Sequence, residues 1–317
     1  MTFFTRSLRA KILVAMVLVP LLMLAACGSS GTSTGGSSSG GSKGTITVGG
    51  KLDVESQLIT TMYALLLRKA GYTVTSKPAL GTTPVVFNAL KSGAIDLYPE
   101  FTATGLNILG IAPSGNPTTD YQNVKNGFEQ QYKITWLDAS PLNDGYAICT
   151  SQTEASKLNV KTISDLAPQV SKLVLASPSD GITFIDALQK TYGFSTKSFK
   201  SLDKVEYSIG FTAVKSNQAQ VNVCYTTDGT VSSQGFIFLQ DDKNGFPQFH
   251  PAPIVRDSVL SKYKDIPSIL NPLAPDLTTD VSIQLQQQVA QKKASGTSVA
   301  QAVKEVATSF LQSKGLY

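Results

Sequence analysis

The residues that could carry out catalysis are few in this chain. It holds one histidine, His250, which any Ser-His-Asp arrangement would have to use. Beyond residue 44 the sequence has no Gly-x-Ser-x-Gly turn between a strand and a helix, and no Gly-x-x-x-x-Gly-Lys-Ser/Thr phosphate loop. Asp241 and Asp242 are paired carboxylates, but their Asp-Asp-Lys-Asn-Gly segment has the composition of a solvated turn. These features favour ligand binding without chemical conversion, with an enzyme as the less favoured alternative.

The cysteines give no sign of a metal site. Cys149 and Cys224 are the only cysteines beyond Cys27, and neither has a partner at zinc-ligand spacing. We therefore expect neither a metal nor a cofactor. A disulfide between the two is permitted in an exported protein, but sequence spacing does not show whether their Cα atoms come within bridging distance. Two buried free thiols are the interpretation that we favour.

The N-terminus has the order of an export signal. Basic residues precede an apolar run over residues 12–23, which is shorter than the roughly 20 residues of a membrane-spanning helix. The run ends in Leu-Ala-Ala-Cys at Cys27, which resembles the lipobox of bacterial lipoproteins, whose cysteine carries the lipid. We predict a signal peptide over residues 1–26 and a lipid anchor at Cys27. An ordinary signal peptide, or a true anchor helix, with a chance cysteine is the alternative.

The stretch after Cys27 has the composition of a linker. Residues 27–44 are mostly Gly, Ser and Thr, which cannot bury apolar surface and predict a flexible linker.

The whole chain has 27 Lys and Arg against 22 Asp and Glu, a net charge of +5. Residues 1–26 contain three of these basic residues and no acidic one, which leaves 24 against 22, or +2. No basic cluster is visible, so we expect no nucleic-acid partner.

Strand and helix patterns alternate from residue 45 onward, which predicts an α/β protein. Two similar β/α blocks are followed by a mostly helical tail with too few strands to form a domain alone. We therefore expect the tail to return to the first block, giving lobe 1 over 45–142 and 240–317 and lobe 2 over 143–239. Such a chain crosses twice between its lobes, and a cleft between lobes is a favoured ligand site. The expected strands lie at 45–50, 72–75, 94–98, 134–137, 145–149, 173–176, 220–225 and 236–239, and the expected helices at 58–70, 84–92, 123–132, 182–192 and 211–218.

Six short motifs follow one another in a fixed order. They are Gly-Gly-Lys at 49–51, Asp-Leu-Tyr-Pro-Glu-Phe-Thr-Ala-Thr-Gly at 96–105, Asn-Asp-Gly-Tyr-Ala at 143–147, Thr-Ile-Ser-Asp-Leu at 162–166, Tyr-Thr-Thr-Asp-Gly at 225–229, and Phe-Pro-Gln-Phe at 246–249 leading to Ala252-Pro253. Together they resemble the substrate-binding proteins of osmoprotectant ABC importers, which capture glycine betaine, choline and related quaternary ammonium compounds. The resemblance implies a two-lobed fold like that of the type II periplasmic binding proteins, and a membrane permease as partner.

The resemblance also implies an aromatic cage for the ligand. Matched residue by residue, the cage falls on Phe101, Tyr146, Tyr225 and Phe249. A quaternary ammonium has no N–H to donate, so aromatic faces recognise it through cation–π attraction. The family has tyrosine where Phe101 and Phe249 stand, and phenylalanine keeps the ring face but loses the hydroxyl. Core packing is the alternative for these two residues.

Three further residues match family positions. Lys51 could pair with a substrate carboxylate, Thr104 could hydrogen-bond the substrate tail, and Asp144 could place negative charge near the cation. A surface lysine and a turn-capping aspartate are the alternatives for Lys51 and Asp144. The segment 177–181 is short and lacks arginine, which leaves choline-like ligands in consideration. For His250 a plain surface position is favoured over a role at the cleft rim.

The sequence thus predicts an extracytoplasmic lipoprotein, anchored to the membrane through its lipid, that delivers a quaternary ammonium solute to an ABC permease. One alternative is capture of another small solute such as an amino acid, with the rings serving as core. Another is a solute-sensing or adhesion lipoprotein that has no transporter.

Overall fold

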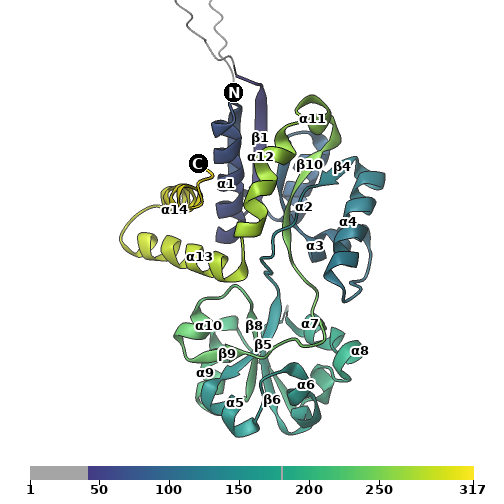
Figure 1. The fold of residues 1–317 in the computed structure, drawn as a ribbon. Coiled ribbons are helices and arrows are strands. Elements are labelled where there is room, and N and C mark those ends of the chain that lie inside the picture. The colour runs from purple at the N-terminus through teal and green to yellow at the C-terminus, as the bar shows by residue number, and fades with distance from the viewer. Residues whose placement is uncertain (1–41, 180) are drawn as a thin grey trace, which may run out of the picture. The chain divides into compact units, whose positions relative to one another are not determined.

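The protein is described by a computed structural model that covers residues 42–317 except residue 180. The predicted signal peptide, Cys27 and nearly all of the predicted linker lie outside the described residues. The described part contains two five-stranded sheets with helices packed on them, which confirms the predicted α/β class (Figure 1).

The first sheet has the order β2-β1-β3-β10-β4. Strands β1, β2 and β3 are parallel, whereas β10 runs antiparallel to both β3 and β4. We call this sheet and the helices packed on it the first lobe. Its strands are β1 (Thr45–Lys51), β2 (Thr73–Gly81), β3 (Leu97–Phe101), β4 (Ile134–Trp136) and β10 (Pro251–Arg256). Its helices are α1 (Val54–Lys69), α2 (Thr83–Ser92), α3 (Thr102–Leu109), α4 (Pro117–Tyr132), α11 (Asp257–Lys262), α12 (Ile266–Leu270), α13 (Thr279–Ala294) and α14 (Val299–Ser313).

The second sheet has the order β7-β6-β8-β5-β9. Strands β6, β7 and β8 are parallel, and β5 runs antiparallel to β8 and β9. This sheet and its helices form the second lobe. Its strands are β5 (Tyr146–Ser151), β6 (Val174–Ser177), β7 (Ser201–Lys204), β8 (Val221–Tyr225) and β9 (Phe236–Phe238). Its helices are α5 (Gln152–Leu158), α6 (Ile163–Leu166), α7 (Gly181–Ala187), α8 (Gln189–Tyr192), α9 (Tyr207–Lys215) and α10 (Thr230–Ser233).

Local sequence explains where the main helices begin and end. The Asp53 carboxylate accepts a hydrogen bond from the Ser56 N–H and caps α1, and Asn116 caps α4 in the same way. Gly93 and Gly193 close α2 and α8 with φ of +80° and +79°, a conformation that glycine adopts without strain. The predicted helix over 182–192 is interrupted at Leu188 and forms α7 and α8 instead.

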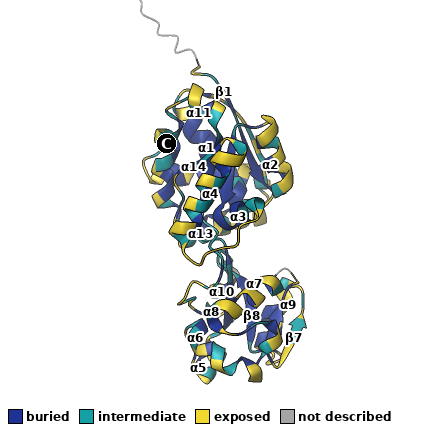
Figure 2. Cartoon of the chain, turned by 90° about the vertical axis from the view of Figure 1, so that its right-hand side faces the viewer, coloured by how far each residue is buried: buried dark blue, intermediate teal, exposed yellow. Residues whose placement is uncertain are grey.

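Each sheet is covered by apolar side chains. In the first lobe, α1 packs between the sheet and α14, and residues such as Ile46, Leu58, Met62 and Val303 are at most 2% exposed. In the second lobe, Ile148, Leu175 and Val223 lie in a separate core, to which Phe246 of the returning segment also belongs. In Figure 2 the sheets and the helix faces turned toward them are coloured mainly as buried, and the outer helix faces mainly as exposed. Because each lobe buries its own apolar set, each has the core that an independent packing unit needs.

Strand β10 was not expected from the sequence. Its Pro-Ala-Pro start argues against a central strand, because proline has no N–H to give to a ladder. In the structure the carbonyl oxygens of Pro251 and Pro253 accept hydrogen bonds from the N–H groups of Ser140 and Leu137, at 2.9 Å each. The prolines are therefore accommodated as acceptors, and the tail completes the first sheet.

Candidate functional site

Three of the four predicted ring residues lie at strand ends on the same edge of their sheets. Phe101 ends β3, Tyr225 ends β8 and Tyr146 begins the antiparallel β5. Tyr146 and Tyr225 are paired across the second sheet, and their ring centroids lie 5.1 Å apart at 53°. Loops beyond the carboxyl ends of parallel strands form the usual ligand site of open α/β sheets. The second lobe thus brings two of the four predicted rings into contact.

Phe184 is a ring that the sequence analysis missed. It lies on α7 and stacks on Tyr146, with centroids 3.9 Å apart and an interplanar angle of 19°. It also meets Phe249 edge-on, with ring centroids 6.1 Å apart. Phe184 therefore connects Phe249 of the returning segment to the two tyrosines. The sequence showed only an apolar residue on a helix after a short loop, a pattern that core phenylalanines share.

A second missed aromatic residue supports Tyr225. The Tyr207 ring lies 4.8 Å from the Tyr225 ring, and the Tyr207 hydroxyl accepts a hydrogen bond from the Tyr225 N–H at 3.2 Å. The same hydroxyl donates to Asp228 Oδ2 at 2.6 Å. Burial, together with the hydrogen bond to Asp228, raises the pKa of Tyr207 above its ordinary value. A neutral hydroxyl held in this way fixes both the ring and the end of β8.

Phe101 has a charged neighbour. The Lys51 ammonium sits 4.6 Å from the Phe101 ring centroid and forms an ion pair with Glu100 Oε1 at 2.5 Å. Lys51 is 9% exposed and Glu100 is fully buried. The other Glu100 oxygen accepts from the Tyr98 hydroxyl at 2.7 Å. The ammonium predicted to meet a substrate carboxylate is therefore already paired, and one face of Phe101 has a cation beside it.

Thr104 lies with Phe184 and Phe249 in one cavity of about 550 Å³. The cavity is lined mainly by apolar side chains from α3, from α7 and from the returning segment. Phe249 is held there by its N–H, which donates to Asn143 Oδ1 at 2.7 Å. This cavity brings the predicted Thr104 and Phe249 together, but Phe101 and Tyr146 are not among its lining residues.

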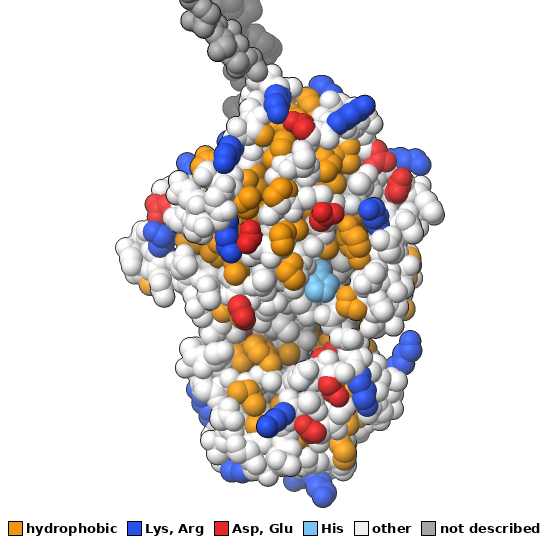
Figure 3. All heavy atoms as spheres, viewed as in Figure 1, with side chains coloured by type: hydrophobic (Ala, Val, Ile, Leu, Met, Phe, Trp, Pro, Cys, Tyr) orange, Lys and Arg blue, Asp and Glu red, His pale blue; other side chains and the backbone are white. Residues whose placement is uncertain are grey.

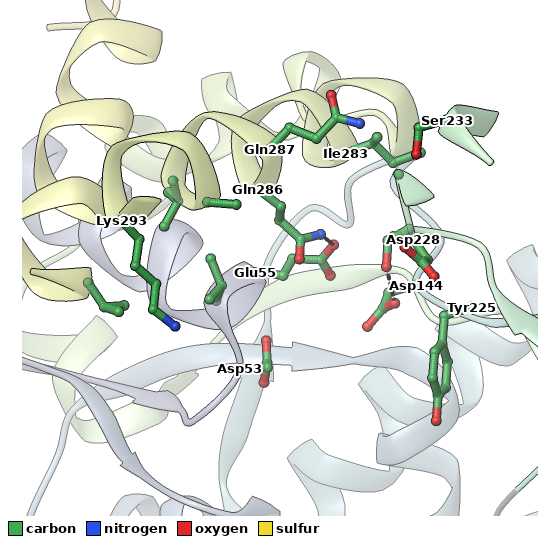
Figure 4. A pocket seen from close by; sticks show the side chains of 16 residues that line it. Asp53, Glu55, Asp144, Tyr225, Asp228, Ser233, Ile283, Gln286, Gln287 and Lys293 are labelled. Atoms are coloured by element: carbon green, nitrogen blue, oxygen red, sulfur yellow. Dashed lines mark hydrogen bonds between the residues drawn. The ribbon is translucent and has the colours of Figure 1, made fainter. Parts of the chain in front are cut away.

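Asp144 lines a different cavity, of about 650 Å³, together with Tyr225. Its carboxylate accepts a hydrogen bond from the Thr227 hydroxyl at 2.6 Å. Burial is the main cause that raises the pKa of Asp144 above its ordinary value. Glu55, at the start of α1, lines the same cavity, and burial followed by the charge of Asp144 raises its pKa well above the ordinary range. Figure 4 shows both carboxylates directed into this space.

One expectation about individual residues was wrong. The structure joins Cys149 and Cys224 in a disulfide between β5 and β8, with Cα atoms 5.9 Å apart, whereas two free thiols were favoured. The reason is that β5 and β8 are adjacent antiparallel strands, which sequence spacing did not reveal. His250 is half-buried, with Nδ1 2.8 Å from the Leu142 carbonyl oxygen, and its side chain is visible at the surface in Figure 3. It lies where the chain returns to the first sheet.

The described residues add two observations on metals and membranes. No cluster of three or more His, Cys, Asp or Glu side chains among them is arranged to hold a metal ion. None of the helices formed by residues 42–317 is both long and apolar enough to cross a bilayer. Acidic and basic side chains are interspersed on the face shown in Figure 3.

Comparisons with known proteins agree with this architecture. The model of a family described as the substrate binding domain of ABC-type glycine betaine transport system matches residues 44–312. The chain is 30% identical over 283 residues to the glycine betaine-binding protein YehZ of Escherichia coli, covering 85% of this chain and 90% of YehZ. It is 28% identical over 248 residues to the carnitine transport binding protein OpuCC of Listeria monocytogenes, covering 75% and 79% of the two chains.

Solved structures show the same fold. A crystal structure of a glycine betaine/carnitine/choline ABC transporter protein superimposes with a TM-score of 0.72 at 23% identity, covering 86% of this chain and 99% of that one. Unliganded YehZ from Escherichia coli gives a TM-score of 0.70 at 29% identity, with the same coverage of 86% and 99%. These neighbours confirm the predicted periplasmic-binding-protein-like fold.

Proposed function

The chain belongs to the family of substrate-binding domains of ABC-type glycine betaine transport systems, and from this premise we propose that it captures a quaternary ammonium solute and delivers it to a membrane permease. The family predicted from the ordered motifs is thus confirmed, and with it the role of a solute-binding protein of an ABC importer. The identity of the solute and the residues that hold it are the proposal.

One observation carries the proposal: the aromatic rings gather at the sheet edge where such proteins bind ligands. Tyr225, Tyr146, Phe184 and Phe249 form a continuous series of ring contacts, from 3.9 to 6.1 Å between centroids. Tyr225 and Phe249 also line cavities that could admit a ligand. Each ring that faces the cation would contribute roughly 0.5–2 kcal/mol, depending on how completely water is excluded.

We propose that the lobes close over the solute by a hinge motion at the two crossing segments. These segments are tied together where they pass, since the Asp144 N–H donates to the Phe249 carbonyl at 3.1 Å. Phe101 on the first lobe and Tyr146 and Tyr225 on the second would then approach the cation from opposite sides. A surface formed by both lobes would reach its docking geometry only in the closed, loaded state, which gives the permease a way to select loaded protein.

Calorimetry with glycine betaine, choline, carnitine and proline betaine tests the solute class. We expect saturable binding of at least one of the four to the purified full chain. Undetectable binding of all four at millimolar concentration would overturn the proposal. Recovery of the bound solute at unchanged mass would support binding without chemical conversion, whereas a product of different mass would indicate an enzyme.

We also propose that the protein lies outside the cytoplasm and is anchored by lipid at Cys27. The supporting features are the basic and apolar order of residues 1–26 and the Leu-Ala-Ala-Cys sequence at their end. Metabolic labelling with palmitate should mark the wild type and should not mark Cys27→Ala. Label that survives the substitution, or no label on the wild type, would contradict the anchor.

A further inference from the structure

The 650 Å³ cavity beside Tyr225 is unusually acidic for a site that would accept a zwitterion. Four carboxylates line it, those of Asp53, Glu55, Asp144 and Asp228, against one ammonium, that of Lys293. Counted at full ionisation, the lining therefore has four negative charges and one positive charge, a formal sum of −3. Figure 4 shows Lys293 on the far side of the cavity from Tyr225 and Asp144.

Glu55 is the residue that points to a ligand. It is 4% exposed, yet its Oε1 has no hydrogen-bond partner among the described residues. Its Oε2 accepts from the Ser282 hydroxyl and from Gln286 Nε2, both on α13. A buried carboxylate oxygen without a partner is costly, and a positively charged group in the cavity would relieve that cost.

The nearby cation of the first lobe is not available for a ligand carboxylate. Lys51 pairs with the fully buried Glu100 at 2.5 Å and lies over the Phe101 ring. Lys293 is exposed near the end of α13. A ligand carboxylate held near Tyr225 would therefore face the carboxyl groups of Asp53, Glu55 and Asp144, which repel it in their ionised form. The repulsion is strongest from the buried Glu55 and weaker from the exposed Asp53.

We propose that the cavity formed by Asp53, Glu55, Asp144 and Tyr225 selects an organic ammonium that carries net positive charge, such as choline, over a zwitterion such as glycine betaine. The inference rests on the proposed function and specifies its substrate class. Tyr225 supplies an aromatic face, and Glu55 and Asp144 supply the opposite charge. A zwitterion gains the first interaction but suffers repulsion of its carboxylate.

The protonation of Glu55 and Asp144 predicts that ligand binding at this site depends on pH. Burial raises the pKa of Glu55, and the charges of Asp144 and Asp53 raise it further, while the Ser282 hydrogen bond and Lys51 lower it. Burial also raises the pKa of Asp144, with Asp53 adding to the rise and Thr227 and Lys51 opposing it. A bound cation favours the ionised carboxylates, so its binding releases protons. Its affinity should therefore rise with pH as the pH passes through these raised pKa values.

The first test compares choline with glycine betaine by calorimetry on the full chain at neutral pH and low salt. We expect choline to bind at least tenfold more tightly. Glycine betaine binding as tightly as choline, or more tightly, would overturn the inference and leave the proposed function intact. Failure of both, together with carnitine and proline betaine, would overturn the proposed function and the inference with it.

Variants that remove one negative charge test whether the cavity carboxylates cause the preference for choline over glycine betaine. Glu55→Gln and Asp144→Asn should each weaken choline binding at least fivefold and bring the choline-to-betaine ratio toward one. Asp144→Asn keeps an oxygen that can accept the Thr227 hydrogen bond, so it remains informative should Glu55→Gln fail to fold. Glu129→Gln is the matched control, because Glu129 is exposed on α4, which packs on α3 and β4. Glu129→Gln should leave both affinities unchanged, and an unchanged ratio in both cavity variants would overturn the inference.

Proton release is the last test. Calorimetry near pH 5 in two buffers of different ionisation enthalpy should show protons released when choline binds. Glu55→Gln should reduce that release. Choline binding without proton release in the wild type would contradict the placement of the ammonium beside these carboxylates.

Discussion

The two sheets have the same arrangement of strands, but the aromatic residues at their strand ends have different surroundings. In each sheet, three parallel strands are followed by an antiparallel strand that adjoins a crossing segment, namely β10 in the first and β5 in the second. The second lobe covalently ties together β5 and β8, the strands that present Tyr146 and Tyr225, through Cys149 and Cys224. The first lobe has a buried ion pair next to Phe101 instead.

The difference shows that one topology can present side chains at the same edge with different electrostatic surroundings. In the second lobe, Tyr146 and Tyr225 are contacted by other rings, those of Phe184 and Tyr207. In the first lobe, Phe101 is contacted by the protein's own ammonium. We therefore expect the aromatic rings of the second lobe to contribute more of the binding free energy. We expect the stability of the first lobe to depend more on its charged side chains.

The largest expected effect comes from breaking the ion pair of the first lobe. Lys51→Met leaves Glu100 buried without its partner, and such losses cost about 3–5 kcal/mol of unfolding free energy. Denaturant unfolding measures the loss. Lys157→Met is the control, because Lys157 pairs with Glu154 at the surface with 57% of its side chain exposed, where a pair contributes at most about 1 kcal/mol. Equal losses in the two variants would contradict the structural role of the buried pair.

The next effect is loss of the disulfide in the second lobe. The bridge closes a loop with a sequence separation of 75 residues, and replacing both cysteines by alanine should cost about 2–4 kcal/mol. Hydrogen exchange gives the location: amides of β5 and β8 should exchange faster, while those of β1 and β3 stay protected. Uniform acceleration in both sheets would show that the bridge does not act on the second lobe alone.

The binding comparison comes third. Tyr225→Ala and Tyr146→Ala should each weaken solute binding more than tenfold, which corresponds to about 1.4 kcal/mol or more. Phe101→Leu should weaken it less, because Lys51 already lies over that ring. Calorimetry with the tightest of the four solutes measures all three. A larger loss of affinity in Phe101→Leu than in Tyr225→Ala would mean that the first lobe contributes more aromatic binding energy than the second.

The smallest effect is expected at Phe184. Phe184→Leu keeps an apolar side chain but removes the stack on Tyr146, and aromatic pairs contribute about 0.5–1.5 kcal/mol beyond burial. Because Tyr146 then loses a contact that orients its ring, we expect binding to weaken two- to fivefold with little change in unfolding temperature. Tighter binding in this variant would mean that Phe184 blocks the Tyr146 face instead of positioning it.

The sequence by itself determined the features that depend on local order. Alternating apolar patterns gave the α/β class, because the period of each run reflects which face is buried. The six motifs indicated the family through their order, and the resemblance assigned Phe101, Tyr146, Tyr225 and Phe249 to the ligand cage. Pattern reasoning did not find β10 or β7, because the prolines of one and the polar residues of the other lack the usual strand signal.

Only the tertiary structure decided which of these residues meet. The bridge between Cys149 and Cys224 depends on β5 and β8 being neighbours across 75 residues of chain. The pairing of Lys51 with Glu100, the stack of Phe184 on Tyr146 and the approach of Glu55 to Asp144 likewise join distant segments. Distances, burial and charge between such segments are properties of packing, and no local pattern in the chain encodes them.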